Sequence, residues 1–190
     1  MFIISEISPQ FHGDIKIAEQ MILQSKLGGA DAVKVQLYTE DQFGIERSYL
    51  SMSYQDLKSL KKYADQLNID LFATPFTRER LDWCLKLGLP YLKVAARMHK
   101  EMPELTKEIM NQNIPTIVSI PSDVNEEEIE IFDHATYLYC VAKYPTRLDE
   151  SSFPNFNNGR FKGISDHTLG NSAALFASSH GAMYLEKHFT

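Results

Sequence analysis

The sequence predicts an α/β fold, namely a compact TIM (β/α)8 barrel that lacks the last helix. Eight short apolar runs, rich in β-branched and aromatic residues, recur along the 190-residue chain, and stretches with helical spacing separate most of them. Runs that are apolar on both faces are typical of a parallel sheet covered by crossover helices. Because the chain ends at the eighth run, the helix that would cover the last strand is expected to be absent. A doubly wound open sheet is the alternative, disfavoured because no glycine-rich phosphate fingerprint follows the first run.

The predicted strands are short and recur from the start of the chain to its end. Their alternation with helical stretches gives the β/α order of a barrel. They cover residues 2–7, 32–37, 71–74, 91–95, 116–120, 136–141, 161–165 and 183–189.

Apolar spacing and glycines mark the helices between these strands. Ile17, Met21 and Ile22 repeat at helical spacing, and a glycine pair follows at positions 28 and 29. Gly88 stands where a later helix should stop before the next strand. Glycine suits both places because it adopts the left-handed conformation at a helix end at little cost.

Capping residues predict where helices begin. Ser53 followed by Asp56 predicts one helix start, and Asp123 ahead of the acidic residues 126–128 predicts another with an acidic first turn. Residues 147–158 contain a proline and three asparagines, a composition typical of a loop. The sixth β/α unit is therefore expected to be irregular.

The composition predicts a single domain that spans residues 1–190 and folds in a reducing compartment. Hydrophobic residues make up 44% of the chain, and 19 Lys and Arg against 25 Asp and Glu give a net charge of −6. That charge argues against broad electrostatic binding to nucleic acid or to an anionic membrane. The chain has neither an apolar run of the roughly 18 residues that span a bilayer nor a leader-like start. With only Cys84 and Cys140 present, we expect a cytoplasmic protein without a disulfide framework.

Polar residues occur at the end of every predicted strand. A polar residue commonly marks a strand end, but barrel enzymes also place their chemistry at the carboxyl ends of the strands. Because all eight runs show the pattern, it predicts a site there. The residues are Glu6, Lys34, Gln36, Thr74, Lys93, Ser119, Lys143, Tyr144, Ser165, Asp166, His167, Glu186, Lys187 and His188.

Two histidines on consecutive runs suggest a metal site. His167 and His188 end the seventh and eighth runs, which are neighbours in a parallel barrel. Imidazole binds Mn, Fe or Zn, and Glu6 on the first strand could supply an oxygen ligand or orient a metal-bound water. Two structural, hydrogen-bonded histidines are the alternative.

Two lysines interrupt apolar strands. Burial of an ammonium is unfavourable unless it meets an anion, so Lys34 and Lys93 predict a phosphate or carboxylate ligand. A structural ion pair with Glu6 or Asp166 is an equally open reading. A third reading is a Schiff base on Lys93, as in class I aldolases.

Seven short strings occur in the order of a known family. They are EISPQFHGD, VKVQLY, ATPF, LKVAA, KYPT, GISDHT and LEKHFT. Together they resemble the catalytic barrel of N-acetylneuraminate synthases. The resemblance implies condensation of phosphoenolpyruvate with an N-acetylated amino sugar, N-acetylmannosamine or a relative, to a nonulosonic acid. It also implies release of phosphate and use of a divalent metal, Mn or Mg.

The resemblance and the strand-end positions together predict the site. His167 and His188 match the metal ligands of the family, and Glu6 matches its first-strand acid. Lys93 matches a phosphoenolpyruvate contact. The predicted catalytic residues are Glu6, Lys34, Lys93 and Tyr144, and the predicted substrate-binding residues are Gln36, Thr74, Ser119, Lys143, Ser165 and Asp166.

Four departures from the family pattern bear on substrate and activity. Residues 10–13 read Gln-Phe-His-Gly in place of an Asn-His-Asn-Gly type string, Ala142 replaces an asparagine, and Ala96 replaces a serine. The family's small C-terminal antifreeze-like domain is absent from this sequence. A barrel that binds phosphoenolpyruvate or sugar without turnover, or with a partner's help, is therefore the alternative. We expect a homodimer or a partner that supplies that domain, because an uncovered last strand exposes apolar surface.

Overall fold

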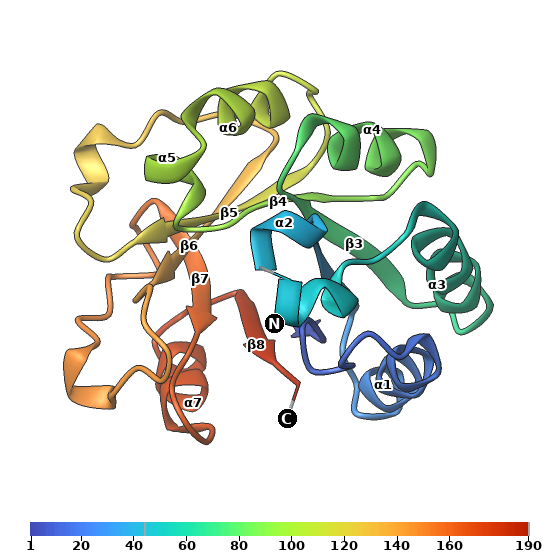
Figure 1. Cartoon of the computed structure of the whole chain (residues 1–190). Helices are drawn as coiled ribbons and strands as arrows, with labels where there is room; N and C mark the ends of the chain where they lie inside the picture. The colour runs from blue at the N-terminus through green and yellow to red at the C-terminus, as the bar shows by residue number, and fades with distance from the viewer. Residues whose placement is uncertain (44, 190) are drawn as a thin grey trace. The chain divides into compact units, whose positions relative to one another are not determined.

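A computed structural model describes residues 1–43 and 45–189. Within these residues, eight strands follow one another in the order β1 to β8, which is the strand order of a closed (β/α)8 barrel (Figure 1). Because a doubly wound sheet reverses its strand order partway, this order excludes that alternative and confirms the predicted class. The strands are β1 (Phe2–Glu6), β2 (Ala32–Leu37), β3 (Asp70–Pro75), β4 (Leu92–Val94), β5 (Thr116–Pro121), β6 (Ala135–Cys140), β7 (Phe161–Asp166) and β8 (Tyr184–His188).

The predicted strands are all present, and each observed boundary lies within one residue of the predicted one. The buried residues of β2 lie on both of its faces, as expected of a strand between helices and the interior of a parallel barrel. Continuous apolar runs of this length are therefore a sufficient signal for the strands of this chain.

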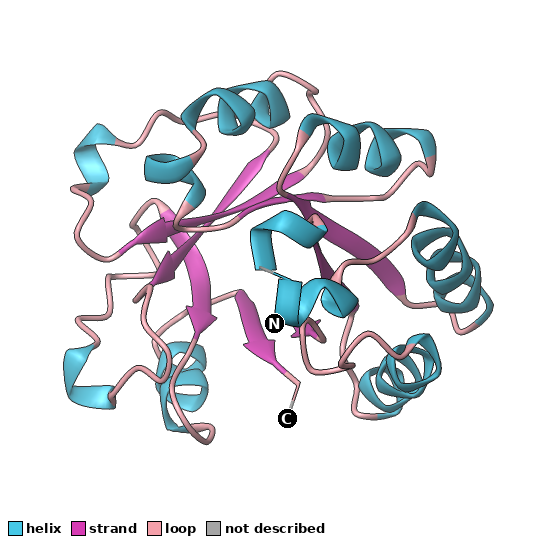
Figure 2. Cartoon of the chain, in the orientation of Figure 1, coloured by secondary structure: helices cyan, strands magenta, loops and turns pink. Residues whose placement is uncertain are grey.

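Helices cover the strands within each part of the chain (Figure 2). None of the described helices is long and apolar enough to cross a membrane. The helices are α1 (Ile15–Leu27), α2 (Glu40–Phe43), α3 (Tyr54–Gln66), α4 (Arg78–Lys86), α5 (Met98–Glu101), α6 (Pro103–Met110) and α7 (Ser172–Ser179), with 3-10 turns at Ile45–Leu50, Glu126–Glu128 and Leu148–Glu150.

The chain divides into two compact units. The N-terminal unit joins Ile4–Leu92 to His188–Thr190, and the C-terminal unit joins Met1–Ile3 to Lys93–Lys187. In the N-terminal unit, α1, α3 and α4 pack beside one another or on β2 and β3. In the C-terminal unit, α7 packs on β7, and β5 to β7 form the best-paired part of the sheet.

Local chemistry accounts for most helix ends. The Ser53 hydroxyl accepts from the backbone N–H of Asp56, whose carboxylate accepts from the Ser53 N–H, so the predicted α3 start is a complete capping box. Gly29 and Gly88 follow α1 and α4 with φ angles of +85° and +60°. Both glycines thus occupy the left-handed conformation that ends a helix, as predicted.

The predicted helix after Asp123 is wrong. Only a 3-10 turn forms at Glu126–Glu128, and the cap is Asn125, whose side chain accepts from the Glu127 N–H at 3.2 Å. The Tyr137 hydroxyl then accepts from the Phe132 N–H at 3.0 Å and donates to the Glu130 carbonyl at 2.9 Å. Backbone groups that a continued helix would use are therefore bound to the next strand.

Cys84 lies on α4 and is buried. Burial raises the pKa of its thiol to about 12, so the group is protonated and unreactive at neutral pH. Cys140 ends β6 and is also buried.

Gly163 on β7 has no room for a side chain. It is in register with Tyr184 of β8, and an added Cβ would lie 1.9 Å from the Tyr184 carbonyl oxygen. We expect Gly163→Ala to lower the free energy of unfolding by about 3 kcal/mol or more, because two paired strands would have to separate. Chemical denaturation measures the change. Gly170→Ala is the control, since nothing lies within 4 Å of its added Cβ and only its φ of +70° opposes the change. Equal stability of Gly163→Ala and wild type would contradict the packing described.

Candidate active site

A buried ion pair joins the first two strands of the N-terminal unit. Glu6 and Lys34 are 1% and 3% exposed and face each other in the register of β1 and β2. The Lys34 ammonium contacts the Glu6 carboxylate. Opposite charges placed together in this way offset the unfavourable burial of each. The structural ion pair with Glu6, which the sequence left open for Lys34, is therefore present.

Two more predicted residues adjoin this pair. Gln36 Nε2 donates to Glu6 Oε2 at 3.0 Å, and Lys34 Nζ donates to Thr74 Oγ1 at 3.4 Å. The other Glu6 oxygen accepts from the Ser8 N–H at 2.7 Å. We call Glu6, Lys34, Gln36 and Thr74 the Glu6 cluster. It brings four of the predicted site residues together from β1, β2 and β3.

His188 also belongs to the N-terminal unit and is bound by Gln10. The Gln10 amide satisfies both its ends when its oxygen accepts from His188 Nδ1 at 2.9 Å and its nitrogen donates to the Ser8 carbonyl at 2.9 Å. Gln10 lies in the string that departs from the family pattern. The Gln10 amide oxygen thus fixes the ring of His188, a predicted metal ligand.

A second buried lysine centres a cluster in the C-terminal unit. Lys93 is 1% exposed, and its Nζ donates to Ser119 Oγ at 2.6 Å and to the Val94 carbonyl at 2.9 Å. Glu186 Oε2 lies 3.9 Å from the same Nζ, and Ser165 Oγ donates to Glu186 Oε1 at 2.8 Å. We call Lys93, Ser119, Ser165 and Glu186 the Lys93 cluster. Its parts come from β4, β5, β7 and β8.

Glu186 is the member of this cluster to which the sequence prediction assigned no role. The signal was available, because Glu186 is a carboxylate inside an apolar run, and the argument that requires an anion for Lys93 requires a cation for Glu186. Glu186 is 6% exposed, close to the 5% of Ser165 in the same cluster. The partner of Lys93 is therefore Glu186, and the predicted alternative of an ion pair with Asp166 is wrong for this lysine.

Asp166 is bound by its own neighbours. Lys187 Nζ donates to Asp166 Oδ2 at 2.7 Å, while the Thr168 N–H and hydroxyl both donate to Oδ1 at 2.8 Å. Asp166 is 4% exposed. These contacts shape the turn after β7 and hold the residues that follow.

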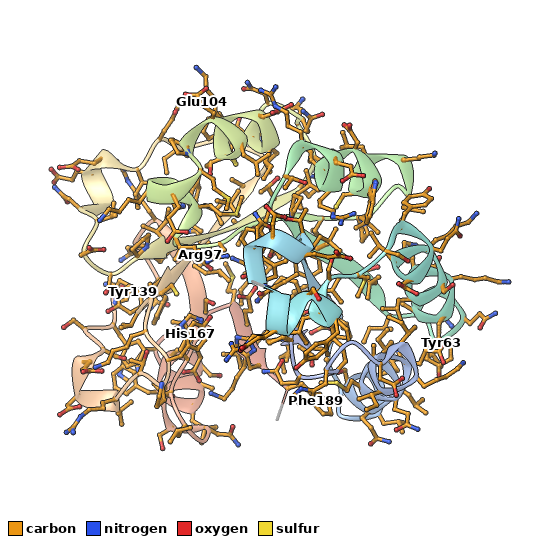
Figure 3. The ribbon with its side chains drawn as sticks, in the orientation of Figure 1. Tyr63, Arg97, Glu104, Tyr139, His167 and Phe189 are labelled. Atoms are coloured by element: carbon orange, nitrogen blue, oxygen red, sulfur yellow. The ribbon has the colours of Figure 1, made fainter. Side chains whose placement is uncertain are left out.

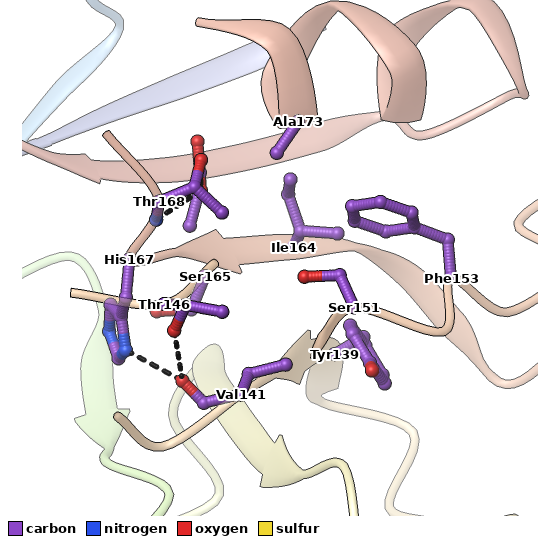
Figure 4. A pocket seen from close by; sticks show the side chains of 11 residues that line it. Tyr139, Val141, Thr146, Ser151, Phe153, Ile164, Ser165, His167, Thr168 and Ala173 are labelled. Carbon is purple, nitrogen blue, oxygen red and sulfur yellow. Dashed lines mark hydrogen bonds between the residues drawn. The ribbon is translucent and has the colours of Figure 1, made fainter. Parts of the chain in front are cut away.

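His167 follows β7 directly (Figure 3), and both of its ring nitrogens are engaged. Nδ1 lies 2.9 Å from the Val141 carbonyl oxygen, which also accepts from Thr146 (Figure 4). Because a carbonyl oxygen only accepts, Nδ1 carries the hydrogen and Nε2 is the acceptor. The Tyr144 hydroxyl donates to Nε2 at 2.7 Å, and the two rings stack with centroids 3.9 Å apart. Tyr144 itself is 64% exposed.

Lys143 lies on the exposed loop after β6. Its Nζ donates to Glu150 Oε1 at 2.5 Å, and the Glu150 carboxylate also accepts from the Arg147 N–H. Hydrogen bonds from Lys143 and Arg147 lower the pKa of Glu150. Of the predicted substrate-binding residues, Lys143 and Asp166 thus lie outside both buried clusters.

The two histidines share a tautomer that suits a metal ligand. His167 and His188 each place Nδ1–H on a carbonyl oxygen, so Nε2 of each ring carries the lone pair. Protein ligands to metals commonly have this arrangement, because the second nitrogen is held by an acceptor. The donor chemistry therefore fits a divalent metal. Among the described residues, no group of three or more His, Cys, Asp or Glu side chains has the arrangement of a metal site.

A small recess lies beside His167 in the C-terminal unit (Figure 4). Its enclosed volume is about 10 Å³, which is room for about one water molecule and far below the roughly 300 Å³ at which typical small-molecule sites begin. It therefore accounts for only part of a ligand site. It is lined by Tyr139, Val141, Thr146, Ser151, Phe153, Ile164, Ser165, Asp166, His167, Thr168 and Ala173.

Comparisons with known proteins agree on one family. A model described as the NeuB family matches residues 45–190. An uncharacterised protein of Methanocaldococcus jannaschii is 31% identical over all of this chain and 62% of its own length. The N,N'-diacetyllegionaminic acid synthase of Legionella pneumophila is 26% identical over all of the chain and 64% of its own. The pseudaminic acid synthase of Campylobacter jejuni is also 26% identical, over 65% of its length. The chain thus spans slightly less than two thirds of these relatives.

Solved structures share the fold. An N-acetylneuraminic acid (sialic acid) synthetase from Leptospira borgpetersenii superposes with a TM-score of 0.89 at 26% identity, over all of this chain and 73% of that one. A spore coat polysaccharide biosynthesis protein of Bacillus subtilis gives a TM-score of 0.74 at 24% identity, over 59% of its length. These structures support the barrel fold for the whole of this chain.

Proposed function

Because this chain belongs to the NeuB family, we propose that it condenses phosphoenolpyruvate with the aldehyde of an N-acetylated amino sugar. N-acetylmannosamine or a relative is the proposed acceptor, and the product is a nonulosonic acid. The single observation that carries the proposal is the Lys93 cluster, in which a buried ammonium meets two strand-end serines. Relatives named as synthases of legionaminic and pseudaminic acids support the sugar-acid class of product.

Phosphoenolpyruvate is proposed to bind at the Lys93 cluster. Its phosphate and carboxylate need cationic and hydroxyl donors, which Lys93, Ser119 and Ser165 offer at the carboxyl ends of their strands. Glu186 occupies part of that donor capacity through Ser165 and lies 3.9 Å from Lys93. We expect the anionic substrate to compete with Glu186 for these donors.

The Glu6 cluster is proposed to handle the added water. The enol carbon of phosphoenolpyruvate bonds to the aldehyde carbon, the C=O π bond of the aldehyde breaks, and its oxygen takes up a proton to become a hydroxyl. Water adds at the phosphate-bearing carbon, the bond from that carbon to the phosphate oxygen breaks, and a ketone remains. A carboxylate near this water can accept its proton. Glu6 is suited to that role because Lys34, Gln36 and the Ser8 N–H hold its two oxygens in place.

His167 and His188 are proposed to hold the divalent metal, Mn or Mg, which would polarise the sugar aldehyde as a Lewis acid. Their Nδ1–H groups are bound to carbonyl oxygens, which makes Nε2 the ligand atom of each ring. At His167 the Tyr144 hydroxyl, which donates to Nε2 in this structure, would be displaced by the metal. We expect His188→Ala to weaken Mn binding by about 100-fold or more while the melting temperature stays within a few degrees. Calorimetric titration with Mn checks this, and unchanged Mn affinity would contradict the assignment.

Phosphate release tests the whole proposal. The wild-type chain is incubated with phosphoenolpyruvate, Mn and a panel of N-acetylated hexoses, with His188→Ala as the control. We expect release that depends on one sugar and on His188. Release without any sugar, or equal release by His188→Ala, would contradict the proposed reaction.

A barrel that needs a partner for turnover is the second candidate. It is favoured by the exposed apolar residues Leu175, Phe176 and Met183 on and after α7. Exposed apolar surface of this kind commonly marks a protein interface. We expect self-association at micromolar concentration, measured by light scattering. A monodisperse monomer would contradict it.

A further inference from the structure

His99 contacts the Lys93 cluster from outside it. The residue lies on α5, the short helix after β4, and its Nε2 is 3.1 Å from the Ser119 carbonyl oxygen on β5. Because that oxygen only accepts, Nε2 carries the hydrogen of the ring and donates it. His99 was not among the site residues predicted from the sequence.

The same residue, Ser119, binds both His99 and Lys93. Its carbonyl accepts from His99, while its hydroxyl accepts from Lys93 Nζ at 2.6 Å. Ser119 is 2% exposed, so its hydroxyl has little freedom to find another donor. A shift of the backbone at Ser119 would therefore move the hydroxyl that receives the Lys93 ammonium.

The environment keeps the His99 ring neutral. Burial lowers the pKa of His99, the bond to the Ser119 carbonyl opposes this, and the charge of Lys93 lowers the pKa further. A neutral ring at pH 7 holds the carbonyl without adding a second positive charge beside Lys93. The cation that an anionic ligand meets in this cluster is thus the Lys93 ammonium.

We propose that His99 is a positioning residue of the phosphoenolpyruvate site, which holds the Ser119 carbonyl so that the Ser119 hydroxyl stays on Lys93. The inference rests on the proposed function. Ser119 supplies one of the two hydroxyls of the Lys93 cluster, and His99 is hydrogen-bonded to the backbone carbonyl of the same residue.

A series of variants separates this role from simple packing. His99→Leu keeps the bulk and removes the donor, whereas His99→Gln places an amide N–H near the position of Nε2. We expect calorimetry with phosphoenolpyruvate to show about tenfold weaker binding for His99→Leu and a change of at most about threefold for His99→Gln. In a Ser119→Ala background, His99→Leu should weaken phosphoenolpyruvate binding by a further factor of less than about two, because both changes disrupt the same contact between the Ser119 hydroxyl and Lys93. His134→Leu is the matched control and should bind phosphoenolpyruvate like wild type. His134 directly precedes β6, at the amino end of the strand and not at the carboxyl end.

Two results would overturn the inference. One is equal weakening by His99→Gln and His99→Leu, and the other is the same effect of His99→Leu with and without Ser119. If wild type binds no phosphoenolpyruvate, the proposed function fails, and a crystal structure of His99→Leu then decides the positioning role. We expect the distance from Lys93 Nζ to Ser119 Oγ to lengthen beyond about 3.5 Å. A distance that stays at 2.6 Å would contradict the inference.

Discussion

Replacement of Lys34 by methionine is expected to lower the free energy of unfolding by about 3–5 kcal/mol. The methionine fills the space of the lysine stem, but Glu6 keeps a negative charge at 1% exposure. A buried charge that has lost its counter-charge is strongly unfavourable, and measured losses for such broken pairs fall in this range. Gln36 and the Ser8 N–H would still bind the carboxylate, which keeps the expected loss within that range. Denaturant unfolding followed by circular dichroism measures it.

A double variant shows whether charge is the cause. Glu6→Gln combined with Lys34→Met removes both charges, and we expect it to recover most of the stability lost by Lys34→Met. Lys16→Met is the matched control, because Lys16 forms an exposed pair with Glu19 on α1, and it should unfold like wild type. If Lys34→Met unfolds like Lys16→Met, or if the double variant is less stable than either single one, the description of the pair is wrong.

Replacement of Lys93 by methionine is expected to lower kcat/KM for phosphoenolpyruvate by about 100-fold or more. Among the four members of the Lys93 cluster, Lys93 alone is a cation. Truncation of one partner of a buried charged contact commonly has an effect of this size. Lys93→Arg keeps the charge but not the ammonium geometry, so an intermediate value is expected. Lys100→Met is the control, since Lys100 is exposed on α5, and it should react like wild type.

Folding must be checked alongside this measurement. Lys93→Met leaves Glu186 with Ser165 as its hydrogen-bond donor, so its circular dichroism spectrum should be compared with that of wild type. A folded Lys93→Met with the kcat/KM of Lys100→Met would show that the Lys93 cluster is structural.

The strands and most members of the two buried clusters could be predicted from sequence because their signals are local. An apolar run by itself predicts a strand. A charged residue inside such a run predicts a partner of opposite charge, as the ion pair of Lys34 with Glu6 illustrates. The identity of the partner is less accessible, because it depends on register between distant strands. Lys93 pairs with Glu186 rather than with Asp166, whose oxygens are taken by Lys187 and Thr168.

The features that escaped prediction depend on tertiary contacts. The acidic stretch after Asp123 has the composition of a helix start, yet a hydroxyl from β6 binds its backbone and ends it after one turn. The contact between the Gln10 amide oxygen and His188 Nδ1 joins residues 178 positions apart, so no local signal in the sequence indicates it. His99 has no strand-end signal because it lies on the short helix α5, and only the folded chain shows its contact with the Ser119 carbonyl on β5.

Calorimetric titration of phosphoenolpyruvate into the wild-type chain tests the central claim most directly, because it needs neither a sugar nor turnover. The Lys93 cluster predicts saturable binding of one molecule per chain, weakened by about 100-fold or more in Lys93→Met and unchanged in Lys100→Met. No binding to a folded wild-type chain, or equal binding by Lys93→Met, would contradict the assignment of this cluster as the phosphoenolpyruvate site.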